Sequence, residues 1–193
     1  RKVWCAASTH PSEEIFCANA HKIIKKNYRN ILTIIIPRHI DRSEKIINDL
    51  KKENLKVLLH NQLDQINDDT DILLVNAYGE ALKFYKAVKC VFLGKSLIES
   101  LKNDSGQNPI EPARLGCKIF HGPYTSNFNE VYQFLSSLKI SYKINNPESL
   151  GRLITEELSK EKVVDEFVIK KIESYGVSTF NNVIKEINIY INS

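Results

Sequence analysis

The segment Ile31-Leu-Thr-Ile-Ile-Ile36 constrains the fold more than any other stretch of the 193-residue chain. It is rich in β-branched residues and apolar on both faces, so both of its faces must be buried. A strand of this kind is typical of the centre of a parallel sheet that helices cover on both sides. Pro37-Arg38-His39 follows it, and then the helical pattern of Ser43–Glu53. The segment therefore predicts one strand–helix unit of an α/β fold.

The same order of short apolar strand, polar turn and helical pattern recurs along the chain. Val3–Ala7 comes before Glu13–Asn27, in which Ile15, Phe16, Ala20, Ile23 and Ile24 have helical spacing. The repetition predicts a Rossmann-like, doubly wound parallel sheet of about six strands. Further strands are expected at Val57–His60, Ile72–Val75, Val91–Gly94, Lys118–Phe120 and Tyr142–Ile144, and further helices at Ala81–Tyr85, Asn129–Leu138, Glu148–Ser159, Val163–Ser174 and Phe180–Ile191.

Composition excludes several classes of function. The net charge is only +4, and the densest basic patch, Lys22–Arg29, reads as a solvated helix face without any nucleic-acid-binding signature. The four cysteines are irregularly spaced beside apolar runs, which suits reduced core thiols and not a zinc site or disulfide framework. No apolar run is long enough for a membrane span, and no stretch of the given sequence reads as a signal peptide. A Gly-x-Gly-x-x-Gly motif and a Walker loop are also lacking, so neither NAD nor ATP is supported.

A short helix with an acidic first turn is predicted after Asn108. Asn108 fits the N-cap and Pro109 the first helical position, whereas Gly116 is expected to end the helix. Glu111 then lies in the first turn. A carboxylate at the rim of a nucleotide site can bind both hydroxyls of a ribose. The alternative is that Glu111 only supports the helix start.

Arg38 follows the central strand, where its planar guanidinium could pair with a phosphate. The alternative is a surface arginine that pairs with Asp41 or Glu44. Tyr78-Gly79-Glu80 likewise follows a buried strand and precedes a helix, at a place where backbone N–H groups can meet an anion or a base edge.

Four stretches of the chain together resemble the donor half of the bacterial Kdo (3-deoxy-D-manno-octulosonic acid) transferases. These are Ser8-Thr-His10, Pro37-Arg-His39, Gly79-Glu80, and Asn108-Pro-Ile-Glu-Pro-Ala113 with the Gly122-Pro123 and Asn127-Phe128 behind it. The resemblance covers residues 1 to about 158. It implies the C-terminal, donor-binding domain of a two-domain glycosyltransferase of the GT-B type, with residues 159–193 as C-terminal helices that pack on this domain or toward an N-terminal domain.

The ligand implied by the resemblance is CMP-Kdo, with no other cofactor and no required metal. Arg38 would face the phosphate and Glu111 would take the ribose. The implied donor-binding residues are Pro37, Arg38, Tyr78, Gly79, Glu80, Asn108, Pro109, Ile110 and Glu111.

The implied reaction is transfer of Kdo from CMP-Kdo to a lipid A precursor, a step of lipopolysaccharide biosynthesis at the cytoplasmic face of the bacterial inner membrane. In the family, the general base, the acceptor site and the membrane contact belong to the N-terminal domain. The chain has no methionine and opens within a predicted strand, so we expect a soluble fragment that binds CMP but does not transfer sugar alone, with no catalytic residue of its own. The alternatives are the nucleotide-binding domain of another GT-B enzyme, a UDP-sugar transferase or epimerase, and a non-catalytic nucleotide-binding module.

This chain departs from the family pattern at several places beside the implied site. Ser12 and Lys95 each stand where the family has a glycine, and about four residues, Lys102-Asn-Asp-Ser105, are inserted before Asn108. The insertion could be surface slack, because lengthening a loop costs little, or it could impair donor binding.

Overall fold

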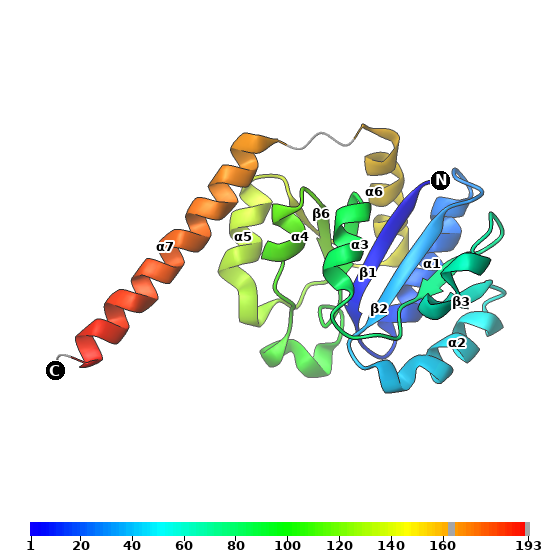
Figure 1. Ribbon diagram of the computed structural model, residues 1–193, viewed down its shortest axis with the longest axis horizontal. Coiled ribbons are helices and arrows are strands. Elements are labelled where there is room, and N and C mark those ends of the chain that lie inside the picture. The colour runs from blue at the N-terminus through cyan, green and yellow to red at the C-terminus, as the bar shows by residue number, and fades with distance from the viewer. Residues whose placement is uncertain (162–164, 192–193) are drawn as a thin grey trace.

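The protein is a single parallel sheet with helices on both faces (Figure 1). The computed structural model describes residues 1–161 and 165–191. All strand pairs are parallel, and the sheet order is β3-β4-β2-β1-β5-β6-β7. The strands are β1 (Val3–Thr9), β2 (Leu32–Pro37), β3 (Val57–Leu59), β4 (Ile72–Leu74), β5 (Cys90–Leu93), β6 (Lys118–His121) and β7 (Ser141–Lys143).

Two sets of helices cover the two faces. One face carries α1, α2 and α6, and the other carries α3, α4, α5 and the first half of α7. The helices are α1 (Glu13–Lys25), α2 (Ser43–Lys52), α3 (Ala81–Ala87), α4 (Ile110–Arg114), α5 (Asn129–Ser137), α6 (Pro147–Ser159) and α7 (Glu166–Ile191), with short 3-10 turns η1 (Ile40–Arg42), η2 (His60–Gln65), η3 (Glu99–Asp104) and η4 (Ser126–Phe128).

Strand β2 is buried along its whole length, as its sequence predicts. Its side chains alternate between the two cores. Ile35 packs with Trp4 and Phe92 under α1, α2 and α6, whereas Ile34 and Ile36 pack in the core under α3, α4 and α5. The four cysteines, all within the described residues, form no disulfide and are buried in these cores. The doubly wound fold is therefore confirmed, with seven strands where about six were expected.

The C-terminal prediction of two helices is wrong. One continuous helix, α7, runs through Tyr175-Gly176, where a break was expected. A glycine inside a helix costs only about 1 kcal/mol, which packing can offset. Here Ile172 is buried and the Tyr175 ring stacks on Phe134 with centroids 4.3 Å apart. Val163 and Val164, where the first of these helices was expected to begin, lie outside the described residues.

The first half of α7 lies on α4 and α5, and the rest of its ribbon extends beyond the sheet and its helices (Figure 1). The division into 1–158 and 159–193 stays a prediction.

A buried carboxylate ties together the amino-terminal edge of the sheet. Asp71, whose side chain is 5% exposed, precedes β4. Its Oδ1 lies 3.2 Å from His21 Nε2 and also contacts the Lys25 ammonium, and its Oδ2 accepts from the Lys56 N–H at 2.9 Å. Burial alone would raise the pKa of Asp71, but the contacts with His21, Lys25 and Lys56 outweigh it and hold that pKa well below its usual range.

We predict that Asp71→Asn lowers the free energy of unfolding at pH 7 by about 3 kcal/mol, because it leaves the partners of a buried ion pair without their counter-charge. Since the folded pKa of Asp71 is depressed, its contribution is complete above the unfolded-chain pKa of about 4 and is lost as the pH falls below that value. Urea unfolding from pH 7 to pH 3 should therefore show the difference between wild type and variant shrinking in acid. Asp69→Asn is the control, because that carboxylate pairs with Lys56 in solvent. Equal losses in the two variants at pH 7 would contradict this role.

Candidate functional site

The carboxyl ends of the parallel strands meet at one edge of the sheet, and the loops that follow them form the candidate site. The sheet extends from β1 through β2, β4 and β3 on one side and through β5, β6 and β7 on the other. The crossovers thus change direction between β1 and β5. Ligands of open α/β sheets bind at the carboxyl ends of strands beside such a switch point.

Glu13 joins the loops on the two sides of this switch point. Its side chain is fully buried, and its Oε2 accepts from the N–H groups of His10 at 2.9 Å and Lys95 at 2.8 Å. Its Oε1 accepts from Ser96 and Leu97 at 3.0 and 3.1 Å. Burial raises the pKa of Glu13, although the four N–H donors oppose that rise. The carboxylate therefore holds the loop after β5 against the start of α1.

Glu14 holds the loop after β2 in the same way. Its carboxylate accepts from both terminal nitrogens of Arg42 at 3.1 and 3.0 Å, and its Oε1 accepts from the Thr9 hydroxyl at 3.0 Å. The N-cap position of α1 is Ser12, which makes no side-chain cap bond, so Thr9 does not cap this helix. Thr9 is therefore part of this buried network.

Ser96 extends the network to β6. Its hydroxyl donates to the Leu93 carbonyl at 2.7 Å and accepts from the Gly122 N–H at 2.9 Å. A Cβ on Gly122 would lie 2.1 Å from the Ser96 carbonyl oxygen, so only glycine permits this close approach. The loops after β1, β5 and β6 thus form one packed unit.

The two departures from the family glycines lie in left-handed backbone. Ser12 has φ 78° and Lys95 has φ 55°, a region that costs a residue with a Cβ about 1–2 kcal/mol. At both positions a residue with a Cβ therefore stands in the backbone conformation that glycine favours.

The structure leaves the Arg38 side chain free. Pro37 is buried at the end of β2, and the Arg38 N–H donates to the Thr9 carbonyl at 3.0 Å. The guanidinium is exposed, and within the described part of the chain it has no hydrogen-bond or ion-pair partner. The expected alternative, a pair with Asp41 or Glu44, is absent among these residues.

The turn Tyr78-Gly79-Glu80 follows β4 and leads into α3. Tyr78 is 64% exposed, and Gly79 has φ 78° with open space around the position of a Cβ. The Glu80 carboxylate pairs with Lys83 at 2.9 Å on the surface. Since β4 lies next to β2, this turn and Arg38 follow neighbouring strands.

Helix α4 begins one residue later than its sequence predicts. It starts at Ile110, and Pro109 occupies the N-cap position. Asn108 still satisfies a free helix donor, because its Oδ1 accepts from the Ile110 N–H at 3.0 Å. Glu111 is exposed in the first turn, and Gly116 ends the helix region with φ 75°, as expected.

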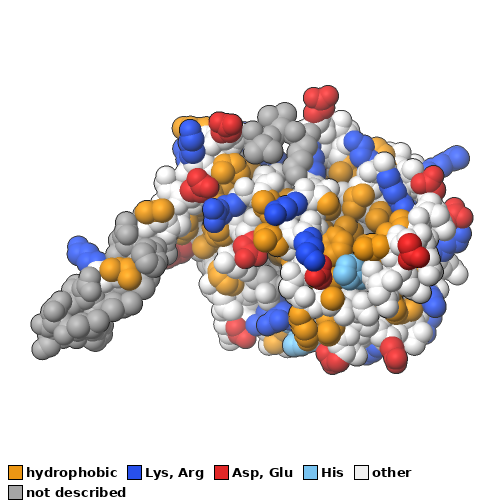
Figure 2. Space-filling view, in the orientation of Figure 1, with side chains coloured by type: hydrophobic (Ala, Val, Ile, Leu, Met, Phe, Trp, Pro, Cys, Tyr) orange, Lys and Arg blue, Asp and Glu red, His pale blue; other side chains and the backbone are white. Residues whose placement is uncertain are grey.

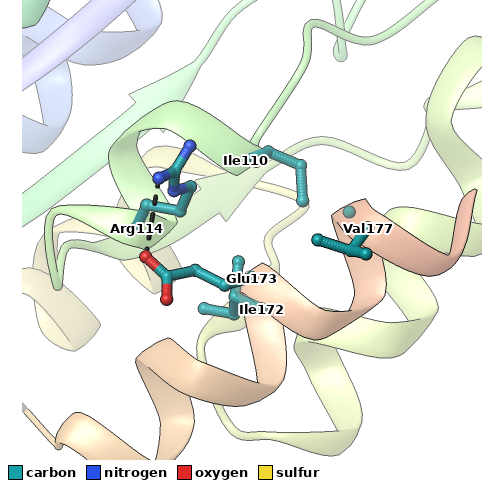
Figure 3. A pocket seen from close by; sticks show the side chains of 6 residues that line it. Ile110, Arg114, Ile172, Glu173 and Val177 are labelled. Carbon is teal, nitrogen blue, oxygen red and sulfur yellow. Dashed lines mark hydrogen bonds and ion pairs between the residues drawn. The ribbon is translucent and has the colours of Figure 1, made fainter. Parts of the chain in front are cut away.

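Two hollows that sequence analysis missed lie beside α4 and α7, and Figure 3 shows the larger of the two. One, of about 460 Å³, is lined by Ile110, Arg114, Ile172, Glu173, Gly176 and Val177, and Arg114 and Glu173 pair across it at 3.5 Å. The other, of about 270 Å³, is lined by Leu82, Glu111, Arg114, Leu115 and Glu173. Their residues come from helices far apart in the chain, so no local pattern could have indicated them.

Helices α3 and α4 pack against each other, so the turns of Glu80 and Glu111 belong to helices on one face of the sheet. Figure 2 shows hydrophobic, basic and acidic side chains mixed over this side of the molecule, without a large field of one charge. Over residues 1–161 and 165–191, no three His, Cys, Asp or Glu side chains gather as metal ligands would. Over the same ranges, no helix combines the length and apolar character needed to cross a bilayer.

Comparison with known proteins identifies relatives of this chain. No protein-family profile matches it. The 3-deoxy-D-manno-octulosonic acid transferase of Haemophilus influenzae is 28% identical over 162 residues, which cover 84% of this chain and 37% of the relative. A bifunctional glycosyltransferase/methyltransferase of Fusobacterium nucleatum is 31% identical over 196 residues, covering 100% of this chain and 29% of the relative. The chain thus spans about a third of these relatives.

Among solved structures, the C-terminal CMP-Kdo binding domain of WaaA from Acinetobacter baumannii matches with a TM-score of 0.76 and 23% identity, covering 90% of this chain and 88% of that one. The chain therefore has the fold of the C-terminal domain of GT-B glycosyltransferases. Within that class, its sequence relatives make it a homologue of the Kdo transferases, corresponding to their C-terminal domain.

We predict that Glu13→Gln lowers the free energy of unfolding by about 3 kcal/mol. The amide keeps one acceptor oxygen, so two of the four buried N–H groups lose their partner. Chemical denaturation measures the loss, with the exposed Glu130→Gln in the first turn of α5 as the matched control. A change below 1 kcal/mol would show that this carboxylate does not hold the loops together.

Proposed function

We propose that this chain binds CMP-Kdo and is the donor-binding domain of a Kdo transferase. The proposal is supported by the relatives' names, by the fold shared with a CMP-Kdo binding domain, and by the residues at the carboxyl edge of the sheet. Arg38 and Pro37, the Tyr78-Gly79-Glu80 turn, and Asn108–Glu111 would form the site.

The unpaired guanidinium of Arg38 is the observation that carries the proposal. An arginine is an effective phosphate ligand because its planar fork makes two charge-assisted hydrogen bonds at once. In this chain the Arg38 guanidinium follows the carboxyl end of β2, an interior strand of the sheet. It is exposed and has no carboxylate partner within the described residues. The phosphate of CMP would be the anionic partner of this guanidinium.

Glu111 would bind the ribose hydroxyls through its exposed carboxylate. Helix α4 has only five residues, so the helix dipole contributes little and the interaction depends on the side chain itself. The Asn108 side-chain oxygen is already engaged by Ile110, which keeps the turn in place and leaves the amide nitrogen to face a ligand.

In the longer protein, this domain would stabilise CMP as it leaves. Negative charge develops on the phosphate during sugar transfer, and a fixed cation such as Arg38 lowers the energy of that state. The general base, the lipid A precursor site and the contact with the cytoplasmic face of the inner membrane would belong to another domain. The 193-residue chain alone should then bind CMP without transferring Kdo.

We predict that the chain binds CMP more tightly than UMP, and that Arg38→Ala and Glu111→Ala each weaken CMP binding about 10- to 100-fold. That range corresponds to about 1.5–3 kcal/mol, the value of a hydrogen bond to a charged group. Isothermal titration calorimetry measures both effects.

Two matched variants serve as controls. Arg29 is exposed before β2 begins, at the opposite edge from Arg38, and Glu148 is exposed in the first turn of α6 on the other face. Alanine at either should leave CMP affinity within about twofold. Preference for UMP would instead indicate a UDP-sugar enzyme, and CMP binding unaffected by Arg38→Ala and Glu111→Ala would indicate another kind of nucleotide-binding module.

A further inference from the structure

Lys95 has an unusual backbone conformation just after the carboxyl end of β5. Its backbone is left-handed, with φ 55°, which disfavours any residue with a Cβ. Two contacts impose this conformation: the Lys95 N–H donates to Glu13 at 2.8 Å, and the Lys95 carbonyl accepts from the Gly106 N–H at 2.7 Å. A strained residue held in place at a ligand-binding edge is an indication of function.

The ammonium of Lys95 is held by the segment inserted before Asn108. Lys95 Nζ lies 2.8 Å from Asp104 Oδ2, and the lysine side chain is 18% exposed whereas that of Asp104 is 74% exposed. Asp104 Oδ1 in turn accepts from Asn127 Nδ2 at 2.7 Å. Asp104 therefore sets the direction of the Lys95 ammonium from a position in solvent, while the lysine side chain as a whole is mostly buried.

The inserted segment is fastened to the neighbouring loop. The Ser105 N–H donates to the Ser126 hydroxyl at 3.0 Å, and the Ser126 N–H donates to the Ser105 hydroxyl at 3.1 Å. The Asn127 N–H donates to the Ser105 carbonyl at 3.1 Å. These bonds show that Lys102–Ser105 is a fixed part of the edge and not slack loop.

Lys95 and Arg38 lie on the two sides of β1. Strands β2 and β5 both pair with β1, so their carboxyl ends are about 10 Å apart. His10 lies between the two loops, with its ring centroid 5.7 Å from that of His39. Burial lowers the pKa of His10, and the nearby charges of His39 and Lys95 lower it further. The side chains of Arg38 and Lys95 are long enough to contact one small ligand from backbone positions this far apart.

We propose that Lys95 binds the carboxylate of the sugar acid in the donor and that Asp104 positions its ammonium. This inference rests on the proposed function. CMP-Kdo carries two anionic groups, the phosphate, which Arg38 would bind, and the carboxylate of the octulosonic acid. Because the family has a glycine at this position, Lys95 would add a contact to that carboxylate which is particular to this chain. An ammonium has three donors, and among the described residues Asp104 engages one. Its pair with the exposed Asp104 is weak, so a second carboxylate can join it.

The test compares CMP, which lacks the carboxylate, with CMP-Kdo on the 193-residue chain by calorimetry. Lys95→Met should weaken CMP-Kdo binding at least tenfold and leave CMP binding within about threefold, and Lys95→Arg should restore most of the loss. Lys95→Gly removes the ammonium and also relieves the left-handed backbone strain at this position. This variant should therefore lose CMP-Kdo affinity selectively, as Lys95→Met does, without a loss of stability relative to wild type. Asp104→Asn should give a smaller selective loss.

The outcomes separate this inference from the proposed function. If wild type binds CMP and the Lys95 variants bind CMP-Kdo as well as wild type does, or weaken both ligands equally, Lys95 only fastens the inserted segment and the inference is overturned. If wild type fails to bind CMP, the proposed function fails first, and the inference fails with it.

Discussion

The carboxylate of Glu13 is the contact on which the edge of this sheet depends. A buried charge is tolerated in a protein only where hydrogen bonds replace the water it has lost. Four backbone N–H groups do so here, one from the loop after β1 and three from the loop after β5. These two loops flank the point at which the crossovers of the sheet change direction, where an open α/β fold would otherwise leave a crevice without support.

The other features of the edge follow from this contact. With Lys95–Leu97 held by Glu13, Ser96 is in place to meet Gly122, and Gly106 is in place to meet Lys95. The loops are thus preorganised before any ligand arrives, which lowers the entropy lost on binding. Exposed groups such as Arg38 and Glu111 are presented on this rigid base. The arrangement suits a domain that binds a charged nucleotide donor.

Local pattern was sufficient to predict most of the fold. The alternation of apolar strands and helical patterns located all seven strands, and the two-faced apolar character of Ile31–Ile36 correctly placed that strand in the interior of the sheet. Prediction failed where contacts between residues far apart in the chain determine the structure. A break at Tyr175-Gly176 was wrongly expected in α7, because the stacking of Tyr175 on Phe134 and the burial of Ile172 outweigh the glycine at 176.

The candidate site could be predicted only in part, because some of its residues are positioned by local pattern and others by distant contacts. Residues that follow strands, such as Arg38 and Glu80, are visible to sequence reasoning because a parallel sheet brings strand ends together. The role of Glu13 was not predictable, because three of its four partners are more than eighty residues away in the chain. The Lys95–Asp104 pair likewise depends on how an inserted loop folds back. The hollows beside α4 and α7 depend on the path of a distant helix.

The central claim is that one cytidine nucleotide contacts the end of β2 and the start of α4 at the same time. Titration of the isotope-labelled chain with CMP, followed by amide NMR spectra, tests this most directly. The account predicts that the amides of Arg38, Gly79 and Glu111 all shift along a single binding curve. Shifts confined to the hollow around Arg114 and Glu173, or different affinities at Arg38 and Glu111, would contradict it.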